Sequence, residues 1–399
     1  MLVGPRQIEE AARRLAGVIR PTPVVESASL SGLAGRMVVC KPEHLQRTGS
    51  FKIRGAYNRI ATLPPGAAVV AASAGNHAQG VALAATLSER ASTIFMPANA
   101  SLPKVEATRH YGAEVVLAGD GVEDCIAAAL ARAEESGAIY VPPFDDPEVI
   151  AGQATVGLEL AGEAAGAEVV VVPVGGGGLA AGIAAALAHR APGVKVVGVE
   201  AAGAPSMRRA LDAGRPVTID EASTMADGIA VRRVSELTLA HARAYLDDVV
   251  LVSEEEISRA LLLLLERSKW LVEPAGAVGL AAVLAGRVPG TGPVAVVLSG
   301  GNVDPILLTR LVEYGLSAAG RYLILRFVLG DHPGALAGLT ATVAGLGLNV
   351  LSVEHHRSGA RVGVDEVEVL LTVETRDPGH RHETLRRLGA AGFRVEELT

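Results

Sequence analysis

The chain has 399 residues, of which 49% are apolar and only 3% aromatic, and its formal net charge is −7. This length allows two or three domains, and the acidic balance offers no basic surface for nucleic acid or an anionic membrane. Cys40 and Cys125 match neither a disulfide framework nor a zinc site, so a reducing cytoplasm is expected. The first residues lack the apolar core of a signal peptide. The long uncharged run at 169–188 is broken by Pro173 and four glycines, so it is not expected to span a membrane.

The N-terminal part of the chain predicts a helix over residues 7–19, a short strand over 37–40 and a helix over 54–61. From residue 68 onward, short valine-rich strands alternate with helices. The predicted strands are 69–72, 92–96, 114–117, 139–141, 168–172, 195–200 and 294–298. The predicted helices are 76–88, 103–111, 122–136, 149–165, 179–190, 206–213, 237–240, 253–268 and 276–285. This alternation predicts an α/β fold with an open parallel sheet, in which ligands bind beyond the carboxyl ends of the strands.

The C-terminal tail has a different pattern. After a predicted hinge at 317–320, strands are expected at 322–329, 349–356, 366–374 and 394–397, with helices at 334–346 and 380–390. This βαββαβ order predicts a ferredoxin-like module, with a small antiparallel sheet backed by two helices.

Lys52 is the candidate for a nucleophilic amine. It lies between Gly49 and Gly55, follows Phe51 and stands at the start of the helix predicted at 54–61. The positive end of a helix dipole and an apolar wall both disfavour the ammonium form, so we expect a lowered pKa. A lone lysine is more often a solvated surface residue, and its assignment therefore depends on the other motifs.

Four successive glycines, 175–178, follow the strand predicted at 168–172. Because they lack Cβ atoms, their N–H groups can converge on a phosphate at the start of the next helix. No lysine or Ser/Thr follows at P-loop spacing. Gly175, Gly177 and Ala180 also fit a loose dinucleotide fingerprint, with Glu200 placed as the ribose-binding acid. Both interpretations stay open at this point.

The loop Ser73-Ala74-Gly75-Asn76-His77 follows the strand predicted at 69–72 and offers a hydroxyl, an amide and an imidazole. Ser73 or Asn76 could also be no more than the N-cap of the next helix. His77 could contact a substrate, although a structural histidine is at least as common.

Ser299 ends the strand predicted at 294–298 and could bond a ring nitrogen or be a satisfied core hydroxyl. Glu273 is expected to be a buried carboxylate, with no role that the sequence assigns. An activated lysine, a glycine cup, an amide and a strand-end serine together match what pyridoxal phosphate needs in a binding site.

The motifs 50–56, 73–80, 175–179 and 299–302 stand in the order found in the threonine dehydratase (threonine ammonia-lyase) family, which the chain resembles from about residue 8 to 314. These are pyridoxal phosphate enzymes of the tryptophan-synthase-β type. The resemblance implies a two-lobed type II fold over residues 1–317, with a small lobe at about 66–143 inserted in the large lobe. The tail, 321–399, resembles an ACT domain through its motif at 331–336.

The resemblance also implies a role for each motif. Lys52 would be the catalytic residue and form the imine with the cofactor, and Phe51 would lie against it. Asn76 would bond the ring hydroxyl oxygen, and Ser299 would face the ring nitrogen. The phosphate would be held by Gly175, Gly176, Gly177, Gly178 and Leu179. The substrate would be contacted by Ser73, Ala74, Gly75 and His77.

The implied reaction is β-elimination: Lys52 removes the Cα proton of L-threonine, the hydroxyl leaves, and 2-oxobutanoate and ammonia are released. L-Serine would give pyruvate. A neutral Ser299 leaves the ring a weaker electron sink than a carboxylate would, which favours elimination. Serine racemase, a relative, has a second serine where this chain has Ala74, which also argues against racemisation. Racemisation, or another hydroxy amino acid as substrate, is kept as the alternative.

Two other classes of protein fit parts of this pattern. A nicotinamide-dependent oxidoreductase would leave Lys52, Asn76 and Ser299 unexplained, and a catalytically inactive amino-acid sensor would not need Lys52. Some relatives bind a divalent cation, but Ser206 replaces the expected aspartate after Glu200, so no such metal site is predicted. A monovalent cation held by carbonyl groups stays as an alternative.

The ACT resemblance implies allosteric control by an amino acid bound between paired modules of neighbouring subunits. A homodimer or homotetramer is therefore expected. The simpler alternative is that the tail only promotes oligomerisation.

Overall fold

The computed structural model describes residues 1–164, 166–318, 320–357 and 363–398. Its internal contacts divide the chain into two units, Met1–Pro305 and Ile306–Thr399. Helix α13 (Pro305–Ala318), which the sequence pattern does not predict, falls almost entirely in the second unit. The predicted hinge includes Ala319, which lies outside the described residues. The domain bounds at 317 and 321 stay a prediction.

The first unit is built on a six-stranded sheet in the order β1-β2-β10-β7-β8-β9. Only β1 is antiparallel to its neighbour; the other strands run parallel. The strands are β1 (Val25–Glu26), β2 (Val38–Lys41), β7 (Val169–Pro173), β8 (Lys195–Ala201), β9 (Asp248–Val252) and β10 (Val294–Val297). All five residues of β7 are buried, because helices cover both faces of a parallel sheet.

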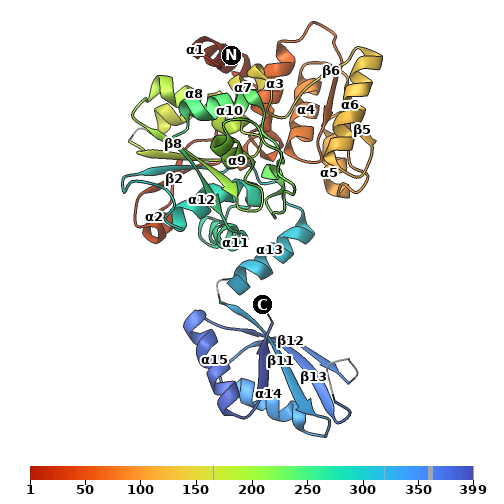
Figure 1. Ribbon diagram of the computed structural model, residues 1–399, viewed down its shortest axis with the longest axis vertical. Helices are drawn as coiled ribbons and strands as arrows, with labels where there is room; N and C mark the ends of the chain where they lie inside the picture. Colours follow the sequence, from red (N-terminus) through yellow and green to blue (C-terminus); the bar gives the residue numbers. More distant parts are fainter. Residues whose placement is uncertain (165, 319, 358–362, 399) are drawn as a thin grey trace. The chain divides into compact units, whose positions relative to one another are not determined.

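The helices of this sheet form two layers (Figure 1). Along β7, Val169 and Val171 face one apolar core, and Val170 and Val172 face the other. The first core is closed by α2 (Ala28–Ala34), α11 (Glu254–Leu263) and α12 (Pro274–Leu284). The second is closed by α7 (Pro147–Glu163), α8 (Gly178–Arg190), α9 (Ser206–Ala213) and α10 (Glu236–Tyr245).

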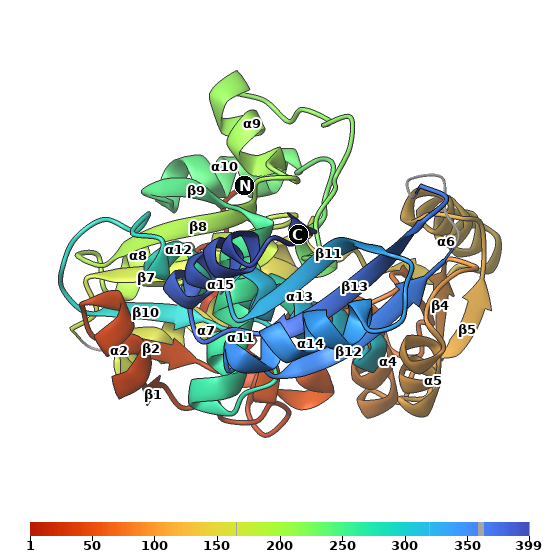
Figure 2. The same ribbon diagram turned by 90° about the horizontal axis from the view of Figure 1, so that it is seen from below.

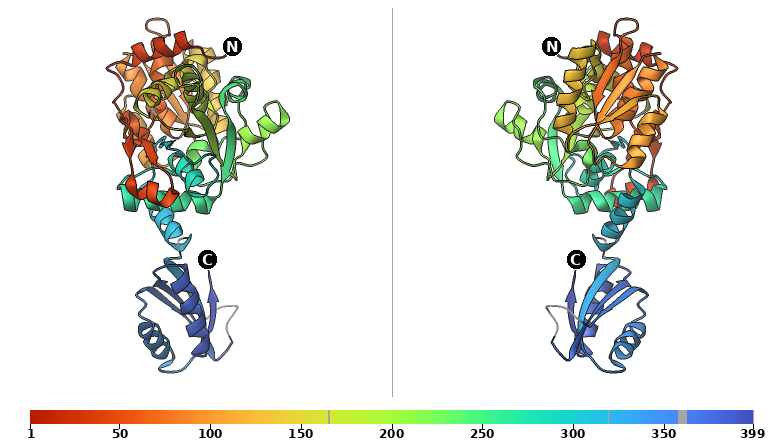
Figure 3. Two further views of the ribbon diagram at one scale, coloured as in Figure 1. Left: turned by 90° about the vertical axis from the view of Figure 1, so that its left-hand side faces the viewer. Right: turned by 90° about the vertical axis from the view of Figure 1, so that its right-hand side faces the viewer.

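A second parallel sheet forms the small lobe, in the order β5-β4-β3-β6. It comprises β3 (Val69–Ala72), β4 (Ser92–Met96), β5 (Glu114–Leu117) and β6 (Ile139–Tyr140). Helices α3 (Lys52–Ala61) and α4 (Asn76–Leu87) pack on one face and α6 (Val122–Ser136) on the other (Figure 3). Helix α5 (Leu102–His110) lies between β4 and β5 in the chain. In the chain, the four strands of this sheet lie between β2 and β7.

The second unit contains an antiparallel sheet in the order β12-β13-β11-β14, made of β11 (Tyr322–Gly330), β12 (Val350–His356), β13 (Glu366–Glu374) and β14 (Arg394–Glu397). Alternate residues of β11 and β13 face a core that also contains Leu339 of α14 (Ala335–Gly345) and Leu388 of α15 (Pro378–Ala390) (Figure 2). Both helices therefore cover one face, and the predicted βαββαβ module is confirmed.

Three elements of the structure differ from the predicted ones. Helix α1 (Pro5–Leu15) ends before residue 19, because Gly17 has a left-handed backbone with φ of 78°. The helix expected over 253–268 is α-helical only to Leu263 and continues as a π turn, Leu264–Ser268. Strand β9, at one edge of the six-stranded sheet, is not among the predicted strands. Among the residues described, no helix has the length and hydropathy needed to cross a membrane.

Candidate active site

Lys52 is the first residue of α3, and its segment is attached to the end of β10. The Phe51 N–H donates to the Ser299 carbonyl at 3.1 Å, and Ser50 pairs with Gly300 in an isolated antiparallel bridge. These contacts bring the lysine segment and the predicted ring-nitrogen contact, which lie far apart in sequence, to the same edge of the large sheet.

The Lys52 side chain is half-buried, and its amine contacts a carbonyl group and an aromatic ring. Its Nζ donates to the Pro143 carbonyl at 3.0 Å and lies 5.3 Å from the centroid of the Phe51 ring. Burial lowers the pKa of Lys52 to about 8, although the negative charge of Glu273 opposes the shift. The direction is the one predicted, and burial, the effect expected of the apolar wall, is its largest cause.

This pKa leads to a pH prediction. At pH 7 about a tenth of the amine is neutral, far more than for an exposed lysine, and only the neutral amine can attack an aldehyde. We expect the rate at which pyridoxal phosphate bonds to the apoprotein to rise with pH and level off above about pH 8. Stopped-flow absorbance measures this rate. A midpoint near pH 10, roughly the value for an exposed lysine, would contradict the buried environment.

The glycine turn at 175–178 joins β7 to α8. Gly177 has a φ of 90°, which L side chains rarely adopt. Within the described part of the chain, no protein acceptor is within hydrogen-bond distance of the N–H groups of Gly175 to Gly178. Unpaired N–H groups at a helix start form an anion site. The turn therefore fits the phosphate of the predicted cofactor.

Pro143 and Phe144 connect the amine to the glycine turn. Pro143 accepts the Lys52 hydrogen bond. The next residue packs on the glycines: a Cβ on Gly178 would lie 2.9 Å from Phe144 Cβ, and one on Gly176 would overlap the Phe144 ring. Pro143 and Phe144 thus contact Lys52 on one side and the glycine turn at 175–178 on the other. No sequence pattern singled out this dipeptide, although it follows β6 just as the other site loops follow their strands.

The loop at 73–77 reaches the same region through α4. Ser73 Oγ accepts from the Gly75 N–H at 3.1 Å, while Ala74 and Gly75 are half-buried. His77 is buried and bonds the Val141 carbonyl through Nε2 at 2.9 Å. Burial, aided by the charge of Lys52, lowers the pKa of His77 to about 3. Ser73 and His77 therefore have protein partners in this structure, but the N-cap of α4 is Gly75, so the N-cap interpretation of Ser73 or Asn76 is wrong.

Asn76 begins α4 and lies beside two residues whose roles the sequence did not assign. Its Nδ2 donates to Glu273 Oε1 at 2.7 Å, and its Oδ1 accepts from Asn302 Nδ2 at 2.7 Å. Gly80, one turn further along α4, packs on the lysine: a Cβ there would lie 3.2 Å from Lys52 Cβ. Asn76 is therefore joined both to the loop after β10 and to the start of α3.

Glu200 has a different role from the one that the dinucleotide interpretation required. It is fully buried and accepts from the N–H groups of Met207 at 2.7 Å and Arg208 at 2.9 Å. Burial raises its pKa to about 7, which these hydrogen bonds partly offset. Glu200 thus caps α9. No cluster of three or more His, Cys, Asp or Glu suited to a metal was found among the described residues.

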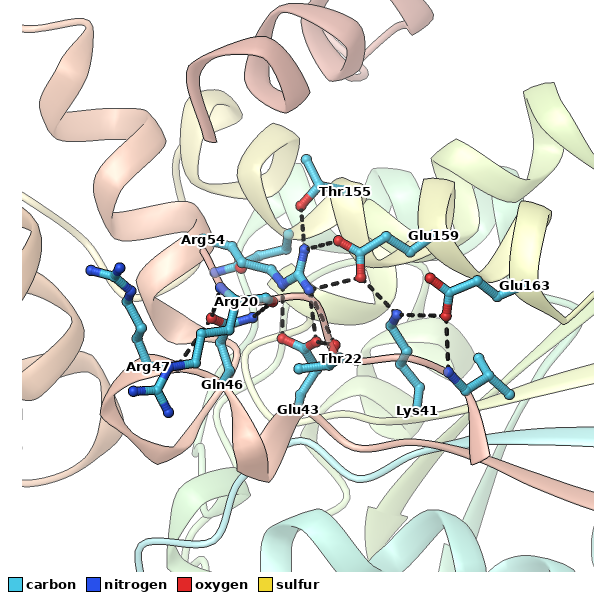
Figure 4. A network of polar contacts seen from close by, with 12 residues as sticks. Arg20, Thr22, Lys41, Glu43, Gln46, Arg47, Arg54, Thr155, Glu159 and Glu163 are labelled. Atoms are coloured by element: carbon cyan, nitrogen blue, oxygen red, sulfur yellow. Dashed lines mark hydrogen bonds and ion pairs between the residues drawn. The ribbon is translucent and has the colours of Figure 1, made fainter. Parts of the chain in front are cut away.

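A buried ionic network is centred on Arg54, two residues after Lys52 in α3 (Figure 4). Arg54, two residues after Lys52, bonds both oxygens of Glu43 and both oxygens of Glu159 at 2.6–2.9 Å. Lys41 pairs with Glu159 at 2.7 Å, and Arg54, Glu43 and Lys41 are fully buried. The network therefore links β2, α3 and α7 through buried ion pairs.

Comparison with known proteins identifies this arrangement. Residues 15–300 match the family of pyridoxal-phosphate dependent enzymes, and residues 323–391 match the ACT domain. The first match covers more than half of the chain. The chain therefore belongs to the pyridoxal-phosphate-dependent enzyme family, and the predicted cofactor and fold class are confirmed.

Within that family, the chain belongs among the L-threonine ammonia-lyases. It is 46% identical over 391 residues to the L-threonine ammonia-lyase of Thermotoga maritima, covering 97% of this chain and 98% of that protein. It is 47% identical over 395 residues to the L-threonine ammonia-lyase of Geobacter sulfurreducens, covering 98% of both. The crystal structure of the T.th. threonine deaminase superposes with a TM-score of 0.72 at 42% identity, covering 75% of this chain and 99% of that chain.

Proposed function

We propose that this chain converts L-threonine to 2-oxobutanoate and ammonia, and L-serine to pyruvate and ammonia. The observation that carries the proposal is the meeting of the Lys52 amine and the glycine turn on Pro143 and Phe144. The names of its relatives support threonine as the substrate.

In this proposal the residues divide the work as follows. Lys52 holds the cofactor aldehyde and, once the substrate amine replaces it, accepts the Cα proton; a pKa of about 8 suits it to both tasks at neutral pH. Pyridoxal phosphate, when bound, stabilises the negative charge that develops at Cα. Its phosphate is held by the N–H groups of the turn from Gly175 to Leu179. Asn76 and Ser299 contact the ring, with Phe51 against it.

The loop at 73–75 favours elimination over racemisation. Racemisation needs a proton donor on the opposite face of Cα from Lys52. Ala74 has no hydroxyl group, and the Ser73 hydroxyl already bonds the Gly75 N–H. With no second hydroxyl in this loop, loss of the β-hydroxyl is the faster outcome once the Cα proton has gone.

An assay of the holoenzyme tests the reaction. We expect release of 2-oxobutanoate and ammonia in equal amounts from L-threonine, release of pyruvate from L-serine, and no accumulation of the D-amino acids. A panel of hydroxy amino acids that includes hydroxyaspartate, followed by 2-oxo acid release and chiral chromatography, measures all of these. Preferential turnover of another panel member, or a D-isomer as the main product, would establish the alternative.

We also propose that residues 321–399 bind an amino acid between neighbouring subunits and regulate the catalytic unit, in a cytoplasmic homodimer or homotetramer. The ACT match and the separate core of this unit support the proposal. The two cysteines, Cys40 and Cys125, are free and buried, which suits a reducing compartment.

Truncation tests the regulatory part. Removing residues 320–399 is expected to leave threonine turnover in place and to abolish any response to isoleucine or valine, because the binding module is gone. Steady-state rates with and without each amino acid provide the measurement, and light scattering reports the subunit number. A response that survives truncation would place the effector site in the first unit. If truncation changed only the subunit number, the tail would be a module that promotes oligomerisation and does not regulate the enzyme.

A further inference from the structure

The Asn76 amide is held in one orientation by a chain of hydrogen bonds. Asn302 Nδ2 donates to the Thr48 carbonyl at 2.6 Å and to Asn76 Oδ1 at 2.7 Å. A backbone carbonyl can only accept, so the contact with Thr48 fixes which end of the Asn302 amide carries the nitrogen. Because that nitrogen faces Asn76 Oδ1, the Nδ2 end of the Asn76 amide must face Glu273.

Glu273 provides the acceptor that completes this chain. Its Oε1 lies 2.7 Å from Asn76 Nδ2, and the residue is only 4% exposed. Its backbone is fixed as well: the Glu273 N–H donates to the Gly300 carbonyl at 3.0 Å, and Pro274 begins α12 directly after it. A Cβ on Gly300 would overlap Glu273 Oε1 and lie 3.0 Å from Asn76 Nδ2. Gly300 thus leaves the room that the pair occupies.

The bond to Glu273 uses part of the hydrogen-bond capacity of the Asn76 amide. The amide has two N–H donors, and one of them is committed to Glu273. Its oxygen is committed to Asn302. The second N–H is therefore the one donor of the Asn76 side chain that remains for a ligand, and the bond to Glu273 decides where that N–H points.

Glu273 can hold the amide in either protonation state. Burial raises its pKa to about 8; the charge of Asp227 adds to the shift, while Asn76, Lys104 and the backbone of Asn302 oppose it. A protonated carboxyl still accepts through its carbonyl oxygen. The contact with Asn76 is therefore kept across neutral pH, with or without the charge.

We propose that Glu273 is a positioning residue, whose carboxyl oxygen fixes the Asn76 amide so that its free N–H is directed at the ring hydroxyl oxygen of pyridoxal phosphate. The inference rests on the proposed contact between Asn76 and the cofactor. It gives a function to a buried carboxylate that lies 197 residues from its partner in the sequence.

Two substitutions separate the hydrogen bond from the charge. Glu273→Gln keeps an acceptor oxygen in place, whereas Glu273→Met keeps the length of the side chain but removes the acceptor. For holoenzyme diluted into cofactor-free buffer with a scavenging apoprotein, we expect Glu273→Met to release pyridoxal phosphate about tenfold faster than the native chain and Glu273→Gln to stay within about twofold. The decay of the visible absorbance measures the release rate. A native rate in Glu273→Met would overturn the proposal.

A double-mutant cycle shows whether Glu273 acts through Asn76. Asn76→Ala should itself speed cofactor release, and adding Glu273→Met to it should change the rate by less than about twofold. If the two effects instead multiply, Glu273 acts independently and the inference fails. If Asn76→Ala has no effect on release, the proposed cofactor contact of Asn76 fails first. The two failures are thus distinct.

Two further variants complete the test: one is a control for removing a carboxylate elsewhere, and the other replaces Glu273→Met if that variant does not fold. Glu168→Met removes a carboxylate that accepts from the Gly292 N–H at 2.6 Å. Glu168 directly precedes β7, at the edge of the six-stranded sheet opposite the site, so this variant should leave cofactor release unchanged. If Glu273→Met does not fold, Gly300→Ala displaces the Asn76–Glu273 pair by its Cβ and must speed release to a similar degree. A native release rate in folded Gly300→Ala would then overturn the proposal.

Discussion

Replacing Lys52 with alanine is expected to lower threonine turnover by at least about 10³-fold. In the proposed function one amine both holds the cofactor and accepts the Cα proton, so its removal would eliminate two functions at once. Alanine also removes the hydrogen bond to Pro143, but it leaves the backbone contact between Phe51 and Ser299 intact. The variant should therefore fold, bind pyridoxal phosphate without a covalent link, and lack the absorbance band of the lysine-bound cofactor.

Ammonia release and the visible spectrum together measure this result. Lys195→Ala is the matched control, because Lys195 is an exposed lysine at the start of β8, the opposite end of that strand from the edge where ligands bind. It should retain native turnover and spectrum. If Lys52→Ala still released ammonia at close to the native rate, the proposed role of Lys52 would be wrong, whatever the spectrum showed.

Much of the fold could be predicted from the sequence because a strand buried on both faces is a continuous apolar run, as in β3, and a strand buried on one face alternates, as in β13. The bounds predicted for β3, β4, β5, β13 and β14 are those observed. Strand β9 was not predicted, although its residues 249–252 form a similar apolar run. Strand β9 has only one neighbour in its sheet and a mixture of exposed and buried residues.

The site could be predicted only as separate pieces. Lys52, Asn76 and Ser299 were proposed as site residues because each follows a strand or begins a helix at the edge where ligands are expected. Their connections depend on how the two sheets of the first unit face each other, which no local pattern records. The Pro143–Phe144 contact and the hydrogen bond from Asn76 to Glu273 both join the small lobe to residues elsewhere in the unit. The burial that lowers the pKa of Lys52 likewise depends on the whole fold and not on a local pattern.

No role of its own was assigned to Arg54 from the sequence. Of the substitutions considered, Arg54→Met is expected to lower the free energy of unfolding the most. Arg54 and Glu43 are both fully buried, and each oxygen of Glu43 bonds the guanidinium at 2.7–2.8 Å. Burial alone would lower the pKa of Arg54, but Glu43 and Glu159 outweigh it and raise the value. Methionine would fill much of the volume and leave Glu43 without its ionic partner.

Breaking a buried ion pair from one side costs about 3–5 kcal/mol, since the remaining charge is stranded in a poorly solvated site. We expect Arg54→Met to lower the free energy of unfolding by that amount, measured from the urea midpoint of the holoenzyme together with the loss of the visible band. Arg190→Met is the control. It removes a pair with Glu9 in which both side chains are about half exposed, and should cost no more than about 1 kcal/mol.

The double variant Glu43→Gln with Arg54→Met decides whether stranded charge is the cause. Removing the carboxylate charge should recover part of the lost stability, because Glu159 retains Lys41 at 2.7 Å and Glu43 no longer carries a buried charge. If the double variant were instead less stable than Arg54→Met, the loss of packing or of network geometry would be the larger cause of the destabilisation. Because Arg54 lies one helical half-turn from Lys52, the same comparison also shows how far cofactor binding depends on this network.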